Sequence, residues 1–79
     1  MRIAYFPIKV EVGAVERVAG RLMDIEEVTE VHSISGVYDI LAKVLVDDYD
    51  QFAEVIPEKI PGIPSIRETN TLLTFTAFK

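Results

Sequence analysis

The stretch Ile40–Val46, which reads ILAKVLV, is the feature that most constrains the fold of this chain. Apolar residues occupy both parities of the run, and Lys43 is its one charged residue. Successive side chains of a strand point to opposite faces, so a half-solvated strand alternates apolar with polar residues. A strand of this composition needs cover on both faces, and helices of the same chain supply the cover on only one of them.

A strand and a helix are predicted before this run. Residues 2–12 favour a first strand, in which Pro7 indicates an edge position or a local break in pairing. Residues 13–25 favour an amphipathic helix. Gly20 weakens that helix and suggests a close packing contact there. The apolar positions recur at helical spacing: Val15, Val18, Ala19, Leu22 and Met23.

A hairpin is predicted next. Residues 28–35 alternate and are rich in Val, Thr and Ile, which favours a second strand. Gly36 then interrupts the pattern, and residues 39–46 form a third strand antiparallel to the second. Asp47 or Asp48 caps a second helix, because a carboxylate accepts the free amides of a first helical turn.

The second helix is expected to end or kink near Ile56, since Pro57 lacks the amide that a continuing helix needs. Residues 66–78 favour a last strand. With short connections and right-handed crossovers, the order βαββαβ predicts a ferredoxin-like α+β fold. This fold is a four-stranded antiparallel sheet with both helices on one face. Residues 1–79 are predicted to form one domain, with no room for a second core.

The second face of this sheet is expected to meet another protein chain. The last strand carries apolar residues on both parities, Leu72 and Phe78 on one and Leu73, Phe75 and Ala77 on the other. No predicted element remains to cover the second face, and a large exposed apolar patch implies a partner. A domain this small, without cysteines, gains stability by oligomerisation. The simplest partner is a second copy, which gives a homodimer and a dimeric α+β barrel.

The charge balance excludes several classes of partner. Thirteen acidic residues against eight basic ones give a net charge of −5, and the basic residues are scattered singly. Direct binding to nucleic acid is disfavoured, and so is binding to an anionic membrane surface, because each needs clustered Lys and Arg. The first residues lack the features of a signal peptide, and no apolar run approaches the length of a membrane span. A cytoplasmic protein is expected.

Catalytic and metal-binding motifs are not found in the sequence. His32 is the only histidine, and neither a cysteine nor a second histidine exists to complete a metal site with it. The acidic run DDYD at residues 47–50 lacks the glycine and the ligand spacing of a calcium loop. No nucleophile motif and no phosphate-binding glycine loop occur. We therefore predict no cofactor, no metal and no enzyme activity.

Two polar segments, SGVYD and RETNT, remain as candidates for a ligand site. Gly36 can adopt a positive φ and leave backbone amides open, and Asp39 adds a carboxylate beside them. Free amides and one carboxylate suit a small zwitterion. Thr69 and Thr71 are two residues apart, so they share a face and can add hydroxyl groups. From these residues alone, a plain hairpin turn with β-favouring threonines is the favoured interpretation, and the ligand site is the alternative.

At these positions the chain resembles the effector-binding (RAM) domain of the Lrp/AsnC transcription regulators. The similar stretches are VERVAGRLMDIEEVTEVHSISGVYDILAKVLV, the acidic-capped helix and IPSIRETNTLLTF. The most specific parts are the Gly-x-x-Asp turn and the Thr-x-Thr of the last strand. Where the family commonly has Pro-Gly-Val, this chain has Pro64, Ser65 and Ile66. The resemblance to a stand-alone RAM domain implies that no helix-turn-helix domain is present.

The resemblance implies a function and a site. It implies an amino-acid effector bound between dimers, assembly into higher oligomers, and co-assembly with full-length Lrp/AsnC regulators. It places effector contacts on Gly36, Val37, Tyr38, Asp39, Thr69 and Thr71, with Ser33 and Ser35 as further contacts. Two alternatives stay open: a small dimeric α+β-barrel enzyme of the monooxygenase or isomerase type, for which His32 and Asp39 are the candidate groups, and a purely structural oligomer.

Overall fold

The computed structural model describes residues 2–79, with four of them described by their backbone alone: Tyr49, Gln51, Val55 and Pro57. The elements follow in the order β1 (Arg2–Val10), α1 (Val15–Met23), β2 (Val28–Ser33), β3 (Ile40–Val46), α2 (Tyr49–Glu54), the π-helical segment η1 (Val55–Lys59), β4 (Ile66–Thr69) and β5 (Leu72–Leu73). The predicted βαββαβ order is confirmed, and a short extra strand follows it.

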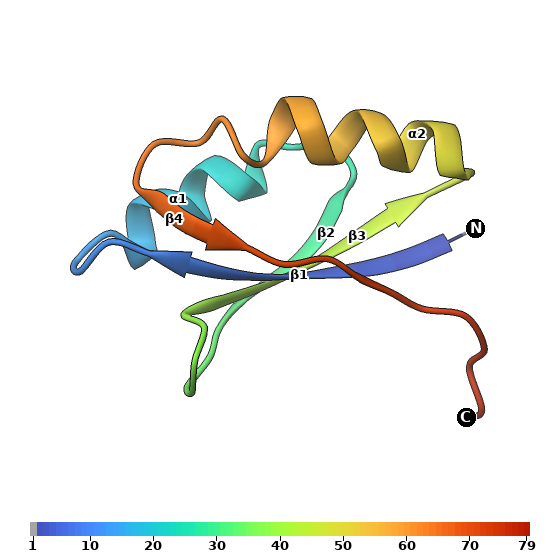
Figure 1. Ribbon diagram of the computed structural model, residues 1–79, viewed down its shortest axis with the longest axis horizontal. Helices are drawn as coiled ribbons and strands as arrows, with labels where there is room; N and C mark the ends of the chain where they lie inside the picture. Colours follow the sequence, from blue (N-terminus) through green and yellow to red (C-terminus); the bar gives the residue numbers. More distant parts are fainter. Residues whose placement is uncertain (1) are drawn as a thin grey trace.

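The strands form one antiparallel sheet in the order β2-β3-β1-β4, and β5 pairs with β1 beyond the end of β4. Both helices lie on the same face of this sheet (Figure 1). This arrangement is the predicted ferredoxin-like fold. Within the described part of the chain, no helix is long and apolar enough to cross a membrane.

One parity of the two central strands forms the core beneath the helices. Its buried members are Ala4, Phe6, Ile8 and Val10 of β1, with Ile40, Ala42, Val44 and Val46 of β3. Val18 and Leu22 lie one turn apart on α1 and are fully buried against this layer. The ring of Phe6 stacks on Phe52 of α2, with 6.0 Å between the ring centroids.

The opposite parity forms a second surface, called the open face below. It consists of Ile3, Tyr5, Leu41, Lys43, Leu45 and Leu72, which are half-buried or exposed. Residues directly opposite each other on antiparallel strands share a face, and the register aligns Tyr5 with both Lys43 and Leu72. Both helices lie on the other side of the sheet (Figure 1), so no described element covers this face. The two apolar faces predicted for residues 40–46 are confirmed.

Pro7 lies in the central strand β1, so the predicted edge position is wrong, whereas the predicted break in pairing is confirmed. The common register of β4 and β5 along β1 places Asn70 opposite Pro7, and Asn70 N donates a hydrogen bond to Pro7 O at 2.9 Å. Pro7 has no amide to donate in return, so the ladder is interrupted here. The strand predicted over residues 66–78 is therefore divided into β4 and β5, and residues 74–79 form no strand.

The second helical segment is longer than predicted. Its α-helical geometry ends at Glu54, near the predicted end, but the backbone continues as the π-helical segment η1 to Lys59. The wider hydrogen-bond spacing of a π-helix accommodates Pro57, which cannot donate to the carbonyl four residues earlier. Lys59 Nζ donates to both carboxylate oxygens of Glu27 at 2.9 and 3.0 Å. This bond raises the pKa of Lys59 and ties η1 to the connection between α1 and β2.

Replacement of Phe6 by Ala is expected to destabilise the domain by about 3–5 kcal/mol, because Phe6 is 1% exposed and its removal leaves a cavity under α2. That loss is a large part of the about 5–15 kcal/mol that holds a typical domain together. Val12→Ala removes an apolar side chain that is fully exposed and serves as the control. Urea unfolding at one protein concentration measures both, and equal midpoints for the two variants would contradict the described core.

Candidate functional site

The turn between β2 and β3, residues 34–39, leaves the sheet on the side away from the helices, where it forms the green loop of Figure 1. Gly36 has a φ of +111°, which confirms the expected positive φ. Val37 is 72% exposed, and a Cβ added at Gly36 would meet nothing within 4 Å. The turn therefore favours glycine for its backbone conformation and not for lack of space.

Asp39 makes three hydrogen bonds, two that tie this turn to the end of β1 and one that closes the turn itself. Its amide donates to Ile8 O at 2.9 Å, and its carbonyl accepts from Ile34 N at 2.9 Å. Its carboxylate Oδ2 accepts from the amide of Val10 at 3.0 Å. The second carboxylate oxygen, Oδ1, makes no hydrogen bond within the described part of the chain. Asp39 thus has a structural role, and one oxygen remains available to a ligand.

A shallow pocket of about 400 Å³ lies beside Asp39. Its lining residues come from β1, the loop before α1, the start of α1, the turn before β3 and β4: Lys9, Val10, Glu11, Val12, Gly13, Val15, Asp39 and Arg67. Two cationic and two anionic side chains therefore share one small hollow with apolar valines. Lys9 Nζ also donates to the carbonyl of Val37 at 3.2 Å, which joins the pocket to the turn.

A β-bulge accounts for the position of Arg67. The pairing of β1 with β4 shifts between Lys9 and Val10, so Lys9 faces Glu68, Val10 faces Ile66, and Arg67 is the extra residue. A bulge changes the direction of the side chain it carries. Lys9 and Arg67 consequently line the same pocket although they belong to neighbouring strands.

The loop before β4 closes the rim of this region through Ser65. Ser65 has a φ of +75°, a conformation that glycine adopts more readily than any other residue. Its carbonyl accepts from Glu11 N at 2.9 Å, and its hydroxyl accepts from Arg17 Nη2 at 2.8 Å. Ser65 therefore holds the left-handed conformation without the glycine that the family resemblance implies at this position.

The other predicted site residues are only partly brought together. One row across the sheet, on the parity that packs under the helices, consists of Ser33, Ile40, Ile8 and Thr69. Thr69 lies two strands from the start of β3, which corresponds to about 10 Å. Thr71 is exposed in the gap between β4 and β5, and Ser35 is exposed in the turn. Of the eight predicted residues, Asp39 alone lines the pocket.

Lys9 and Arg67 are the pocket residues that the sequence reasoning missed. Lys9 carries a signal, because it is the one charged residue in an otherwise apolar stretch from Ile3 to Val10. Arg67 carries no such signal, since its place at the pocket depends on a bulge that no local pattern predicts.

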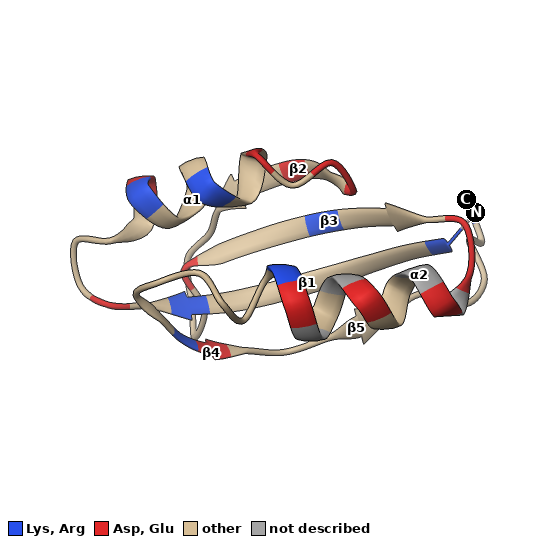
Figure 2. Ribbon diagram, turned by 90° about the horizontal axis from the view of Figure 1, so that it is seen from above, with Lys and Arg blue, Asp and Glu red and all other residues tan. Residues whose placement is uncertain are grey.

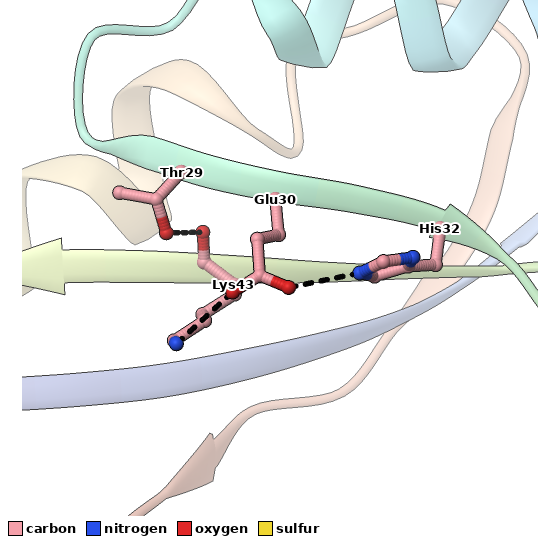
Figure 3. A network of polar contacts seen from close by, with 4 residues as sticks. All are labelled: Thr29, Glu30, His32 and Lys43. Carbon is pink, nitrogen blue, oxygen red and sulfur yellow. Dashed lines mark hydrogen bonds and ion pairs between the residues drawn. The ribbon is translucent and has the colours of Figure 1, made fainter.

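His32 belongs to a small polar network on the same side of the sheet as the open face (Figure 3). Glu30 Oε1 lies 3.0 Å from His32 Nε2, and Lys43 Nζ donates to Glu30 Oε2 at 3.0 Å. Thr29 Oγ1 donates to the carbonyl of Lys43 at 3.3 Å. The contacts with His32 and then Lys43 lower the pKa of Glu30, and the bond to Glu30 raises the pKa of Lys43.

The exposure of this network does not suit a catalytic or metal centre. The side chain of His32 is 58% exposed, and its partner in the network is a single carboxylate. Among the described residues no polar or charged side chain is buried, and no group of three or more His, Cys, Asp or Glu side chains could hold a metal ion.

The fold and the site together define a class of protein: a ferredoxin-like domain with an uncovered apolar sheet face and a charged pocket beside a glycine turn. The family model for the Lrp/AsnC ligand binding domain matches residues 3–79, and the chain belongs to this family of ligand-binding domains of transcription regulators. The resemblance noted from the Gly-x-x-Asp turn is confirmed.

The curated relatives are transcription regulators. The proline dehydrogenase transcriptional activator of Rhizobium radiobacter is 35% identical over 66 residues, which cover 84% of this chain and 42% of that protein. The HTH-type transcriptional regulator FL11 of Pyrococcus abyssi is 29% identical over 77 residues, which cover 98% of this chain and 50% of that protein. The chain spans about half the length of the curated relatives it matches.

Solved structures confirm the fold. TTHA0845 from Thermus thermophilus matches with a TM-score of 0.93 and 28% identity, over 100% of this chain and 99% of that one. AsnC of E. coli matches with a TM-score of 0.92 and 25% identity, over 99% of this chain and 53% of that one.

Two glycine substitutions are expected to have opposite effects on stability. A Cβ at either Gly36 or Gly20 meets nothing within 4 Å, so the close contact expected at Gly20 is not found and only the backbone distinguishes the two sites. Gly36→Ala forces a side chain into positive φ and is expected to destabilise by about 1–2 kcal/mol. Gly20→Ala, inside α1, is expected to stabilise by about 0.5–1 kcal/mol. Chemical unfolding measures both, and a stabilising Gly36→Ala would contradict the described turn.

The contribution of Glu30 to stability is expected to disappear in acid. Its pKa in the folded chain lies below the ordinary value of 4.5, so its contacts stabilise the fold above that pH and are lost as the pH falls through the folded value. The difference in Tm between the wild type and Glu30→Gln should therefore be larger at pH 6 than at pH 3. Glu68→Gln, at another exposed carboxylate, is the control. A difference that grows towards pH 3 would refute the network.

Proposed function

We propose that this domain binds a free amino acid at the pocket beside the turn, and that ligand binding is coupled to the association of its copies. The observation that carries the proposal is the combination in one pocket of the Asp39 carboxylate with the cations Lys9 and Arg67. This charge pattern is complementary to that of a zwitterion. The anionic group can bind the ligand's ammonium, and the cationic groups can bind its carboxylate.

The chemistry of each group supports this assignment. Within the described part of the chain no hydrogen bond reaches Asp39 Oδ1, so it can accept from a ligand ammonium while Oδ2 keeps its bond to Val10. Lys9 and Arg67 can each donate to a carboxylate, and such charge-assisted hydrogen bonds are stronger than neutral ones. The exposed amides of the turn, which Gly36 leaves uncovered, offer a second place for the carboxylate.

The remaining surface of the pocket favours an apolar ligand side chain. Val12 and Val15 line it from the loop before α1 and from the first turn of that helix. A volume of about 400 Å³ exceeds that of one amino acid, and the pocket is shallow on this chain alone. We infer that a neighbouring copy completes the enclosure, which agrees with the site between dimers that the family resemblance implies.

Association of copies is supported by the open face. Its apolar members Ile3, Tyr5, Leu41, Leu45 and Leu72 are uncovered by any described element. A two-fold dimer in which the open faces meet would remove this surface from water and supply stability that a 79-residue domain lacks. An amino acid that binds one assembly better than another then shifts the equilibrium between them by its differential affinity.

A regulatory role follows from the family rather than from any chemistry of the domain. The relatives are transcription regulators, and a net charge of −5 with scattered basic residues does not suit direct contact with DNA. We propose that the domain acts on transcription by binding its effector and by assembling with other copies or with regulators that carry the same domain, and that it is not an enzyme.

The expected response to the right amino acid is a rise in Tm. A ligand at ten times its Kd adds about 1.4 kcal/mol, which raises the Tm of a domain of this size by several degrees. A thermal-shift screen of the twenty amino acids at millimolar concentration measures this. If none of them raises the Tm, amino-acid binding is refuted.

The role of Asp39 is tested by Asp39→Asn, which keeps an acceptor for the Val10 amide and removes the charge that would hold an ammonium. The Kd of the active amino acid is expected to rise about 10- to 100-fold, the loss of one charge-assisted hydrogen bond. Asp24→Asn, at an exposed carboxylate after α1, matches the change in net charge and should leave the Kd unchanged. Isothermal titration calorimetry measures both, and equal constants for the two variants would place the site elsewhere.

A further inference from the structure

Glu11 is the one charged residue of the pocket to which the proposed amino-acid site gives no role. The site assigns the ligand's ammonium to Asp39 and its carboxylate to Lys9 and Arg67, and these three residues line the pocket together with Glu11. Figure 2 shows charges of both signs at the end of the sheet where β1 ends and where β3 and β4 begin. A ligand with a single ammonium and a single carboxylate therefore leaves the carboxylate of Glu11 unmatched.

The backbone fixes the position of Glu11 at the rim of this pocket. Its amide donates to Ser65 O at 2.9 Å, and its carbonyl accepts from Ala14 N at 3.0 Å. The second bond closes a four-residue turn whose third residue, Gly13, has a φ of +81°, a conformation that favours glycine. Because both polar backbone groups of Glu11 are engaged, its side chain starts from a fixed point of the pocket wall.

The side chain of Glu11 is available to a ligand. Its carboxylate makes no hydrogen bond or ion pair within the described part of the chain, and the guanidinium of Arg67 makes none there either. The two opposite charges line one pocket without pairing with each other. A ligand that carries both signs of charge can therefore engage both groups.

Glu11 and Asp39 are anchored on opposite sides of β1. The amide of Val10 donates to the Asp39 carboxylate, at the start of β3. The amide of Glu11 donates instead to Ser65, just before β4. In the sheet β1 has β3 on one side and β4 on the other, so these successive amides point in opposite directions. A ligand ammonium at Asp39 consequently leaves Glu11 for a second cationic group.

We infer that the pocket selects an amino acid with a cationic side chain, and that Glu11 binds the charged end of that side chain. This inference rests on the proposed amino-acid site and names its ligand class. Val12 and Val15, which suit an apolar side chain, contact the methylene stem, while the charged end reaches the rim. The net charge of −5 also attracts a cationic ligand over longer distances.

L-lysine and L-norleucine form a matched pair of ligands for the test. Norleucine has the same unbranched four-carbon side chain as lysine and lacks only its terminal ammonium. Isothermal titration calorimetry of the full chain measures both dissociation constants. Lysine is expected to bind at least about fivefold more tightly than norleucine, the factor that corresponds to an ion pair at the strong end of the exposed range.

Glu11→Gln removes the negative charge and keeps the length of the side chain. The Kd of lysine is expected to rise about 5- to 10-fold while the Kd of norleucine stays the same, so that the preference for lysine disappears. Glu16→Gln is the matched control, because Glu16 is an exposed carboxylate in the first turn of α1 that does not line the pocket. This control should leave both constants unchanged.

Each contrary outcome overturns the inference in a distinguishable way. Norleucine or glutamate that binds as tightly as lysine contradicts the ligand class and leaves the amino-acid site in place. A similar rise of both constants after Glu11→Gln shows that Glu11 holds the α-ammonium and not the side chain. A preference for lysine that survives Glu11→Gln shows that another group binds the side-chain cation. If no amino acid binds the wild type, the proposed function fails and the inference fails with it.

Discussion

The two central strands of the sheet are apolar on both faces, and the rest of the structure depends on how each face is covered. The helices bury one parity of the two strands, Ala4 to Val10 in β1 and Ile40 to Val46 in β3. The other parity, the open face, has no cover within the described residues. Burial of apolar area is the main favourable term in folding and association, so the same physical effect that builds the core favours association of copies.

Asp39 connects this architecture to the candidate site. It stands where the turn enters β3, and its carboxylate and backbone together hold the turn against the last residues of β1. β1 also carries Lys9 and, through its bulge, determines where Arg67 lies. A ligand that engages Asp39 would act on a group already bonded to the central strand, which gives a physical route from the pocket to the sheet and to the faces that would associate.

Much of the fold could be predicted from the sequence because the signals were local. The apolar residues on both parities of 40–46 indicated the two apolar faces, and Gly36 indicated the positive φ that the turn adopts. The resemblance to the Lrp/AsnC regulators depended on a few residues around that turn and is confirmed.

What could not be predicted depends on pairing between distant segments. Pro7 indicated an edge position or a break in pairing, and only the register reveals that it lies in a central strand with its missing amide opposite Asn70. The division of the last strand depends on its register opposite Pro7, and the π-helical continuation through Pro57 has no simple sequence signal. The place of Arg67 could not be predicted for the same reason, since a bulge brings it to the pocket beside Lys9.

The binding of an amino acid beside the turn is tested most directly by two-dimensional NMR of ¹⁵N-labelled protein during titration with the amino acids. We expect one of them to shift the amide signals of residues 34–39 and of residues 10–13 around the pocket, in a saturable way and before signals of the helices move. Saturable shifts confined to a region remote from the turn, or no shifts at millimolar ligand, would contradict this site.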